Sequence, residues 1–238
     1  MADHIVTSYD QELKGIRTKI AEMGGLAEGL VSDAVTSLTR MDTTLAQKVV
    51  LTDARLDRLQ HEVEDRTIQI IARRQPLAVD LREIVGALRI SNDLERIGDM
   101  AKNISKRVTT LNGSNIVAKQ LVIGVEHLAE IALEQLKDVL DAFTSRDDSA
   151  ALRVRERDDE IDALYTSLFR ELLTYMMEDP RNITFCTHLL FCAKNIERIG
   201  DHATNIAETV HFVVTGVQLS DERQKSDISA TIALDLPD

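Results

Sequence analysis

Apolar residues recur at spacings of three and four along most of this chain, which is the pattern of an α-helix that buries one side. The spacing is clearest over residues 94–111 and again over residues 196–213. A 3-4 spacing sustained over this length is typical of helices that pack side by side in a bundle. The apolar residues of the two seams are Leu94, Ile97, Ala101, Ile104, Val108 and Leu111, and then Ile196, Ile199, Ala203, Ile206, Val210 and Val213.

The apolar pattern predicts three helices in each half of the chain, joined by short segments. Helices that are joined by short segments become antiparallel neighbours. We therefore predict an all-α fold, a tandem repeat of two antiparallel three-helix bundles. The predicted helices cover residues 8–40, 44–73 and 79–111 in the first half, and residues 116–144, 148–178 and 181–215 in the second.

The two halves are copies of one unit. Residues 91–104 match residues 193–206 at eight of fourteen positions with an offset of 102, and earlier in the chain the match continues with an offset of 105. The offset changes near two proline-bearing turns, where a difference in length is easily accommodated. The predicted domains are residues 1–112 and residues 113–217, followed by a loose C-terminal tail over residues 218–238.

The amino-acid composition restricts both the fold class and the kind of partner that we expect. Only three prolines and ten glycines occur in 238 residues, which favours long helices over a fold with many turns. Aromatic residues make up 3% of the chain and there is no tryptophan, so aliphatic side chains must build the core. The net charge of −12 argues against nucleic acid as the main partner, because nucleic acid binds to basic surfaces. The same charge permits cation binding.

The sequence also bears on location. Charged residues occur throughout the first thirty positions and no run of 18 apolar residues exists, so we expect neither a secretory signal nor a membrane span. Cys186 and Cys192 are six residues apart and fall on different faces of a helix, so we do not expect them to form a disulfide. We interpret both as small apolar core residues of a protein in a reducing cytoplasm.

Four pairs of carboxylates at i,i+4 spacing carry the candidate chemistry. Four residues of helix bring a side chain to within about 40° of its starting direction, so each pair lies on one face, away from the apolar seam. Like charges at this spacing destabilise a helix by a few tenths of a kcal/mol, so their repetition at equivalent positions indicates a role. The pairs are Asp53 with Asp57, Glu95 with Asp99, Asp158 with Asp162, and Glu197 with Asp201.

The pairs predict two metal sites of four carboxylates each, one between the second and third helices and one between the fifth and sixth. Oxygen ligands suit magnesium, calcium, manganese and iron, and the choice among these ions and zinc stays open. Gly98 and Gly200 stand between paired carboxylates, where a glycine costs about 1 kcal/mol relative to alanine. We expect each to permit close approach by a neighbour. The plain alternative is a metal-free helical scaffold with solvated acidic faces.

Motifs of known enzyme classes are mostly absent. The chain has no Walker A loop, no H-E-x-x-H and no G-x-S-x-G. Its one E-x-x-H runs from Glu208 to His211, and the equivalent residues of the first half are Lys106 and Thr109. A di-iron site of the ferritin type needs two such motifs. A di-iron oxidase is therefore weakly supported, and a carboxylate-bridged metal oxidase or hydrolase is kept as an alternative function.

The segments "RQPLAVDLREIVGALRISNDLERIGDMAKNI" and "AKNIERIGDHATNIAE" resemble the paired motifs of PhoU proteins, the accessory regulators of bacterial phosphate-specific transport. The resemblance covers the chain up to the tail. It implies two three-helix bundles and metal clusters held by Glu/Asp-x-x-x-Asp motifs, all four of which are intact here. The second half has "EDPRNITFC" in place of "RQPLAVDLR", so a role for Asp80 or Arg82 has no clear counterpart there.

The resemblance also implies a function, which requires no catalytic step of the protein itself, so we predict a protein that is not an enzyme. PhoU-like proteins restrain phosphate uptake and repress the phosphate-starvation response when phosphate is plentiful. The resemblance implies an adaptor that links the ATP-binding subunit of the phosphate ABC transporter to a sensor histidine kinase. The resemblance thus implies a homodimer in the cytoplasm, or at the periphery of the inner membrane through these partners.

Overall fold

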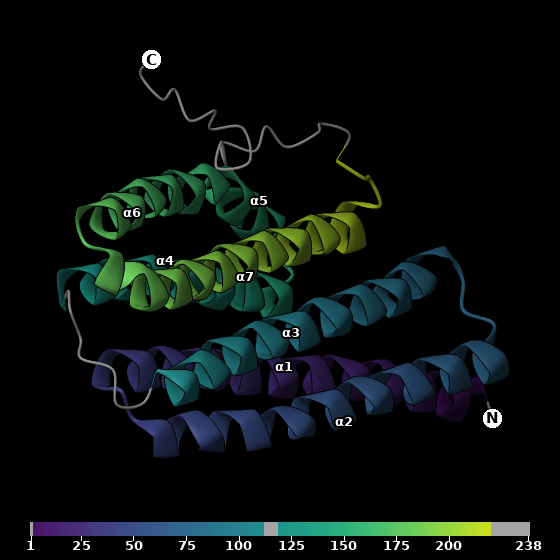
Figure 1. Cartoon of the computed structure of the whole chain (residues 1–238). Helices are drawn as coiled ribbons and strands as arrows, with labels where there is room; N and C mark the ends of the chain where they lie inside the picture. Colours follow the sequence, from purple (N-terminus) through teal and green to yellow (C-terminus); the bar gives the residue numbers. More distant parts are fainter. Residues whose placement is uncertain (1, 112–118, 220–238) are drawn as a thin grey trace.

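The computed structural model describes residues 2–111 and 119–219, and every regular element in these two segments is helical. Each half of the chain folds into three long helical segments, and the middle segment of the second half is divided into two helices (Figure 1). The first half holds α1 (Ala2–Arg40), α2 (Thr43–Arg74) and α3 (Ala78–Thr110), and the second holds α4 (Lys119–Ser145), α5 (Asp148–Glu156), α6 (Asp158–Glu178), the short 3-10 helix η1 (Pro180–Asn182) and α7 (Ile183–Thr215).

The two halves form separate three-helix bundles that are stacked on one another (Figure 1). Helices α1 and α3 of the first bundle pack against α4 and α7 of the second, and the contact between α3 and α7 is the most extensive. Helix α2 lies on one outer side of the stack, and α5 and α6 lie on the opposite side. The predicted all-α fold of two tandem three-helix bundles is confirmed.

The core follows the apolar seams of the sequence. All twelve seam residues of α3 and α7 are buried, and most of them have no exposed surface. Burying one such aliphatic side chain stabilises the fold by roughly 1.5–3 kcal/mol. Cys186 and Cys192 are also buried and form no disulfide, as predicted. Burial alone raises the pKa of the Cys186 thiol.

Equivalent residues start the second helix of each bundle. Asp42 accepts a hydrogen bond from the backbone N–H of Leu45 at 3.0 Å, and Asp147 accepts one from Ala150 at 3.0 Å. These N-caps satisfy N–H groups that have no partner within the helix. The residue before each cap has a left-handed backbone conformation (Met41, φ 50°; Arg146, φ 56°). The repeat therefore preserves the turn as well as the helices.

The predicted helix over residues 148–178 is wrong in one respect, because the chain breaks it at Arg157. The side-chain amide of Gln135, a buried residue of α4, donates a hydrogen bond of 2.9 Å to the carbonyl oxygen of Arg157. A side-chain donor competes with the helical N–H groups for that carbonyl. The equivalent of Gln135 in the first bundle is Leu30, and there α2 runs unbroken.

The ends of several predicted elements differ from the structure or lie outside it. Helix α1 begins at Ala2, several residues before the predicted start. The predicted start of the fourth helix at residue 116 and nearly all of the predicted tail lie outside the described residues. Within the described part of the chain, no helix combines the length and the apolar character that crossing a bilayer requires.

Candidate functional site

The first carboxylate cluster forms where α2 approaches α3 at Gly98. A β-carbon added to Gly98 would collide with a methyl group of Leu56 and would lie 3.1 Å from Oδ1 of Asp53. Leu56 stands between Asp53 and Asp57 on α2. The absent side chain of Gly98 thus lets the acidic face of α2 come close to α3. This confirms the predicted close approach and identifies the neighbour.

Burial and like charges act together on this cluster. Burial raises the pKa of Asp53, and the charges of Asp57 and Asp99 raise it further, whereas Lys102 lowers it. Burial also raises the pKa of Glu95, with added contributions from Asp99 and Asp57. Since charges act strongly only at short range in a protein, all four predicted carboxylates of the first half belong to one electrostatic cluster.

Lys102 is a member of the first cluster that the sequence analysis missed. Its Nζ lies 2.6 Å from Oδ2 of Asp53 and 3.2 Å from Oδ1 of Asp99, so it bridges α2 and α3. The hydrogen bond to Asp53 is the main reason that the pKa of Lys102 is raised, and the ammonium group stays charged. The available signal was its position three residues after Asp99, which places the two side chains on one helix face.

The second cluster forms at the equivalent place between α6 and α7. A β-carbon on Gly200 would lie 2.5 Å from Cδ1 of Ile161, the counterpart of Leu56. Glu197 and Asp162 are both buried, with 2% and 4% of their surface exposed. Burial raises the pKa of Glu197, and the charges of Asp201 and Asp162 act in the same direction.

The two clusters differ in what neutralises them. Position 102 is equivalent to position 204, and the Thr204 hydroxyl donates a hydrogen bond of 2.9 Å to Asp158, the counterpart of Asp53. A neutral hydroxyl therefore stands where the first cluster has an ammonium group. In the second cluster, Nζ of Lys194 lies 2.8 Å from Oε1 of Glu197, and Oε2 of Glu197 is buried without a hydrogen-bond partner.

The carboxylate oxygens of both clusters are the type of ligand that a hard cation prefers. Buried carboxylates with raised pKa values and the orphaned oxygen of Glu197 would all gain from a bound cation. In the side-chain positions of residues 9–111 and 121–219, however, no three carboxylate, histidine or cysteine groups converge closely enough to hold one. At the first cluster Lys102 occupies the place between Asp53 and Asp99. Ligation there requires Lys102 to leave, and metal binding stays a prediction.

Comparison with known proteins shows to which family this duplicated architecture belongs. The family model described as "PhoU domain" matches the chain twice, over residues 20–108 and over residues 125–210. The chain belongs to the PhoU family.

Relatives in this family align with nearly the whole chain. A protein of Rhizobium meliloti (strain 1021) named "Phosphate-specific transport system accessory protein PhoU homolog" is 59% identical over 96% of both chains. A protein of the same name from Caulobacter vibrioides (strain NA1000 / CB15N) is 51% identical over 96% of this chain and 99% of its own. The crystal structure of PhoU from Pseudomonas aeruginosa is similar with a TM-score of 0.84 and 38% identity, covering 88% of this chain and all of that one.

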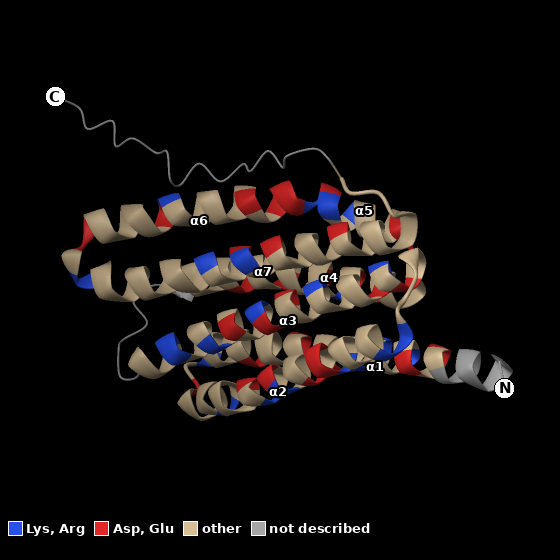
Figure 2. Ribbon diagram, turned by 90° about the vertical axis from the view of Figure 1, so that its right-hand side faces the viewer, with Lys and Arg blue, Asp and Glu red and all other residues tan. Residues whose placement is uncertain are grey.

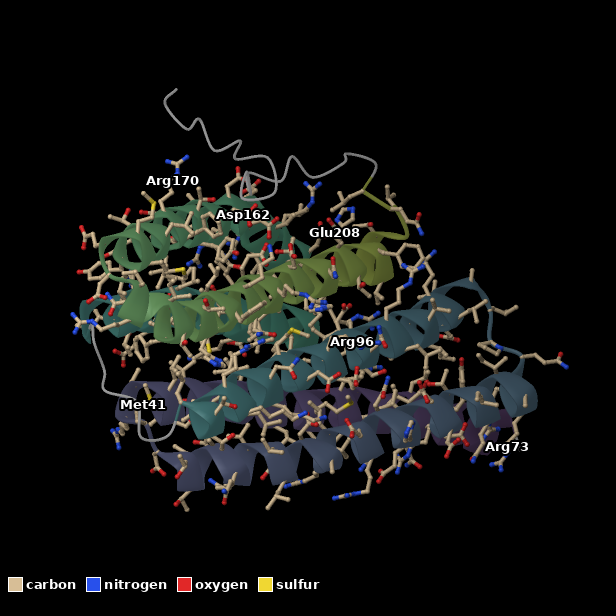
Figure 3. The ribbon with its side chains drawn as sticks, in the orientation of Figure 1. Met41, Arg73, Arg96, Asp162, Arg170 and Glu208 are labelled. Atoms are coloured by element: carbon tan, nitrogen blue, oxygen red, sulfur yellow. The ribbon has the colours of Figure 1, made fainter. Side chains whose placement is uncertain are left out.

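The E-x-x-H motif of this PhoU-family chain serves to hold two helices together. Nδ1 of His211 lies 2.6 Å from Oδ1 of Asp148, and Nε of Arg155 donates to Oε1 of Glu208 at 3.3 Å. Both contacts attach α7 to α5, and Glu208 lies on α7 away from Asp162 of the second cluster (Figure 3). His202, next to Asp201 in sequence, instead contacts Asp93 of α3 at 2.9 Å. These contacts between helices depend on tertiary packing that the sequence pattern did not reveal.

Proposed function

We propose that this PhoU-family chain is an accessory protein of a phosphate-specific transport system that restrains phosphate uptake and the phosphate-starvation response when phosphate is plentiful. The observation that carries the proposal is the 59% identity, over 96% of both chains, to a protein named as such an accessory protein. An alignment of this length extends through both bundles. No catalytic step is part of the proposed role.

The proposed mode of action is that of an adaptor. The chain links the ATP-binding subunit of the phosphate ABC transporter to the sensor histidine kinase of the phosphate two-component system, in the cytoplasm or at the inner membrane through these partners, and it acts as a homodimer. Exposed apolar residues at the turn between α2 and α3 support a role in protein contacts, with Leu77 81% and Val79 56% exposed. Apolar residues on the surface mark contact sites when they gather in one place.

The carboxylate clusters are proposed to bind cations that regulate or stabilise this adaptor. The ions would neutralise buried acidic side chains: Asp53, Asp57, Glu95 and Asp99 at the first site, and Asp158, Asp162, Glu197 and Asp201 at the second. Elemental analysis of protein purified without chelators tests this part separately. Metal above background whose content falls in the Glu197→Gln/Asp201→Asn variant, which changes the second site alone, supports it, and no metal in the wild type leaves the metal-free scaffold.

Deletion of the gene tests the regulatory role. A reporter of the phosphate-starvation response is measured at high phosphate in the deletion strain and in the same strain carrying the wild-type gene. We expect high reporter output without the gene and repression when it is restored. Output that stays fully repressed without the gene contradicts the proposed role, whatever the metal content.

A further inference from the structure

A basic groove lies between α3 and α7, where the two bundles meet. Its volume is about 560 Å³, which is in the range of sites for small molecules. Four of its nine lining residues are Lys or Arg and none is acidic, in a chain whose net charge is −12. Figure 2 shows Lys and Arg on both α3 and α7 on the face turned to the viewer. The basic residues are Lys106 and Arg107 of α3, and Lys194 and Arg198 of α7.

Three of these cations have no acidic partner among the residues that the structure describes. Lys194 is paired with Glu197, but no carboxylate contacts Lys106, Arg107 or Arg198. Nε of Arg107 is buried and has no hydrogen-bond partner. A buried donor that is left unpaired costs free energy. The groove therefore holds positive charge that no carboxylate of the described residues neutralises.

Arg107 is held in place by neutral groups. Its guanidinium carbon lies 4.1 Å from the centre of the Phe191 ring, and Nη1 lies 3.5 Å from Nδ1 of His188. Burial lowers the pKa of His188 and the charge of Arg107 lowers it further, so the imidazole is neutral near pH 7. The guanidinium is thus oriented before any ligand arrives, which reduces the entropy cost of binding.

The internal repeat supplies a comparison within the same molecule. A second groove of about 480 Å³ also lies between α3 and α7, and several of its lining residues are the repeat equivalents of those that line the basic groove. With the offset of 102, Lys106 becomes Glu208, Arg107 becomes Thr209 and Lys194 becomes Asn92.

The two acidic residues of this second groove are already paired. Asp93 contacts His202 at 2.9 Å, and Glu208 contacts Arg155 at 3.3 Å. The packing of α3 on α7 therefore does not require a set of cations. Only one copy of the duplicated groove is basic, and three of its four cations form no ion pair with a carboxylate of the described residues.

We propose that the basic groove binds a small anion through its phosphate group. Arginine presents donors in a planar fork that matches phosphate oxygens, and lysine adds a point charge. The ligand chemistry is shared by free phosphate, pyrophosphate and nucleotides, and Phe191, which is 47% exposed, offers a surface on which a base can stack. The proposal rests on the groove alone and does not depend on the regulatory role.

Isothermal titration calorimetry on the full chain tests the proposal, with inorganic phosphate, pyrophosphate and ATP as separate ligands in metal-free buffer. The groove variant is Arg107→Gln/Arg198→Gln. The matched control is Arg89→Gln, because Arg89 lies 5.3 Å from the Phe212 ring in the second groove. Thermal unfolding of each variant confirms that it is folded.

We expect at least one of the three ligands to bind the wild type, with affinity reduced about tenfold or more in the groove variant, as loss of charge-assisted hydrogen bonds implies. The control should bind nearly as the wild type does. Binding of phosphate as tight as that of ATP identifies free phosphate as the ligand, and stronger binding of ATP than of pyrophosphate identifies a nucleotide. Absence of binding by all three ligands, or binding that only Arg89→Gln weakens, overturns the proposal.

Discussion

At the scale of single residues, the acidic clusters are destabilised by their own burial. Asp53 and Glu197 are almost fully buried, and burial is the main reason that their pKa values are raised. The sequence predicted which carboxylates lie on one face, because helical spacing determines that. It could not predict that Lys102 reaches Asp53 or that Thr204 reaches Asp158, since these contacts depend on how closely two helices approach.

Glu197→Gln should make stability less dependent on pH. The pKa of Glu197 is higher in the folded than in the unfolded protein, so its favourable contribution exists at low pH and is lost as pH rises through the folded value. Without metal, the variant should match the wild type at pH 4 and exceed it at pH 7 by on the order of 1 kcal/mol in free energy of unfolding. Urea unfolding at both pH values measures this.

The control for this experiment is Glu171→Gln, because Glu171 is an exposed residue of α6. Its effect should be within about 0.5 kcal/mol at both pH values. Manganese or magnesium added at pH 7 should raise the melting temperature of the wild type more than that of Glu197→Gln. An equal effect of pH on the two proteins would contradict the assignment of Glu197 as a buried acid.

Lys102→Met should lower stability and favour metal at the first cluster. The change leaves Asp53 buried without its cation, which costs on the order of 2–3 kcal/mol in free energy of unfolding in metal-free buffer. Because the ammonium no longer occupies the place between Asp53 and Asp99, added manganese should recover more stability than in the wild type. Thermal unfolding with and without manganese measures both effects.

Lys48→Met is the control, since Lys48 forms a pair with Asp33 in which both side chains are well exposed. Such a surface pair contributes about 0–1 kcal/mol. If Lys102→Met costs no more than Lys48→Met, the ammonium does not stabilise the buried cluster.

At the scale of helices, glycines decide how closely the elements pack. The seams and the repeat were sufficient to predict the long helices, because periodicity of apolar residues reports which face is buried. The break at Arg157 escaped prediction because its cause, the amide of Gln135, lies on another helix. The apolar period runs through the break, so nothing local marks it.

Gly98→Ala should destabilise the first bundle. The added methyl group would meet Leu56, which is fully buried and has little room to move, so we expect a cost of about 1–3 kcal/mol in free energy of unfolding. Gly25→Ala is the matched control, because a β-carbon there has no atom within 4 Å. That change should stabilise α1 by about 0.5–1 kcal/mol. Chemical unfolding of the two variants should show opposite signs, and a stabilising Gly98→Ala would exclude the close packing of α2 on α3.

At the scale of the whole molecule, duplication produces two similar bundles whose chemistry differs. One cluster is bridged by an ammonium group and the other by a hydroxyl. One groove between α3 and α7 is basic, while its counterpart holds two acidic residues that are each paired with a basic side chain. The sequence predicted the duplication but not these differences, because they arise between residues that are far apart in the chain. Such asymmetry is compatible with the proposed adaptor role, in which each half would contact a different partner.

The rate of phosphate uptake at high external phosphate tests the central claim most directly. Labelled phosphate is supplied to a strain that lacks the gene and to the same strain with the wild-type gene restored. We predict uptake several-fold faster without the gene, returning to the parental rate on restoration. An uptake rate that is the same with and without the gene would contradict the claim that this chain restrains phosphate transport.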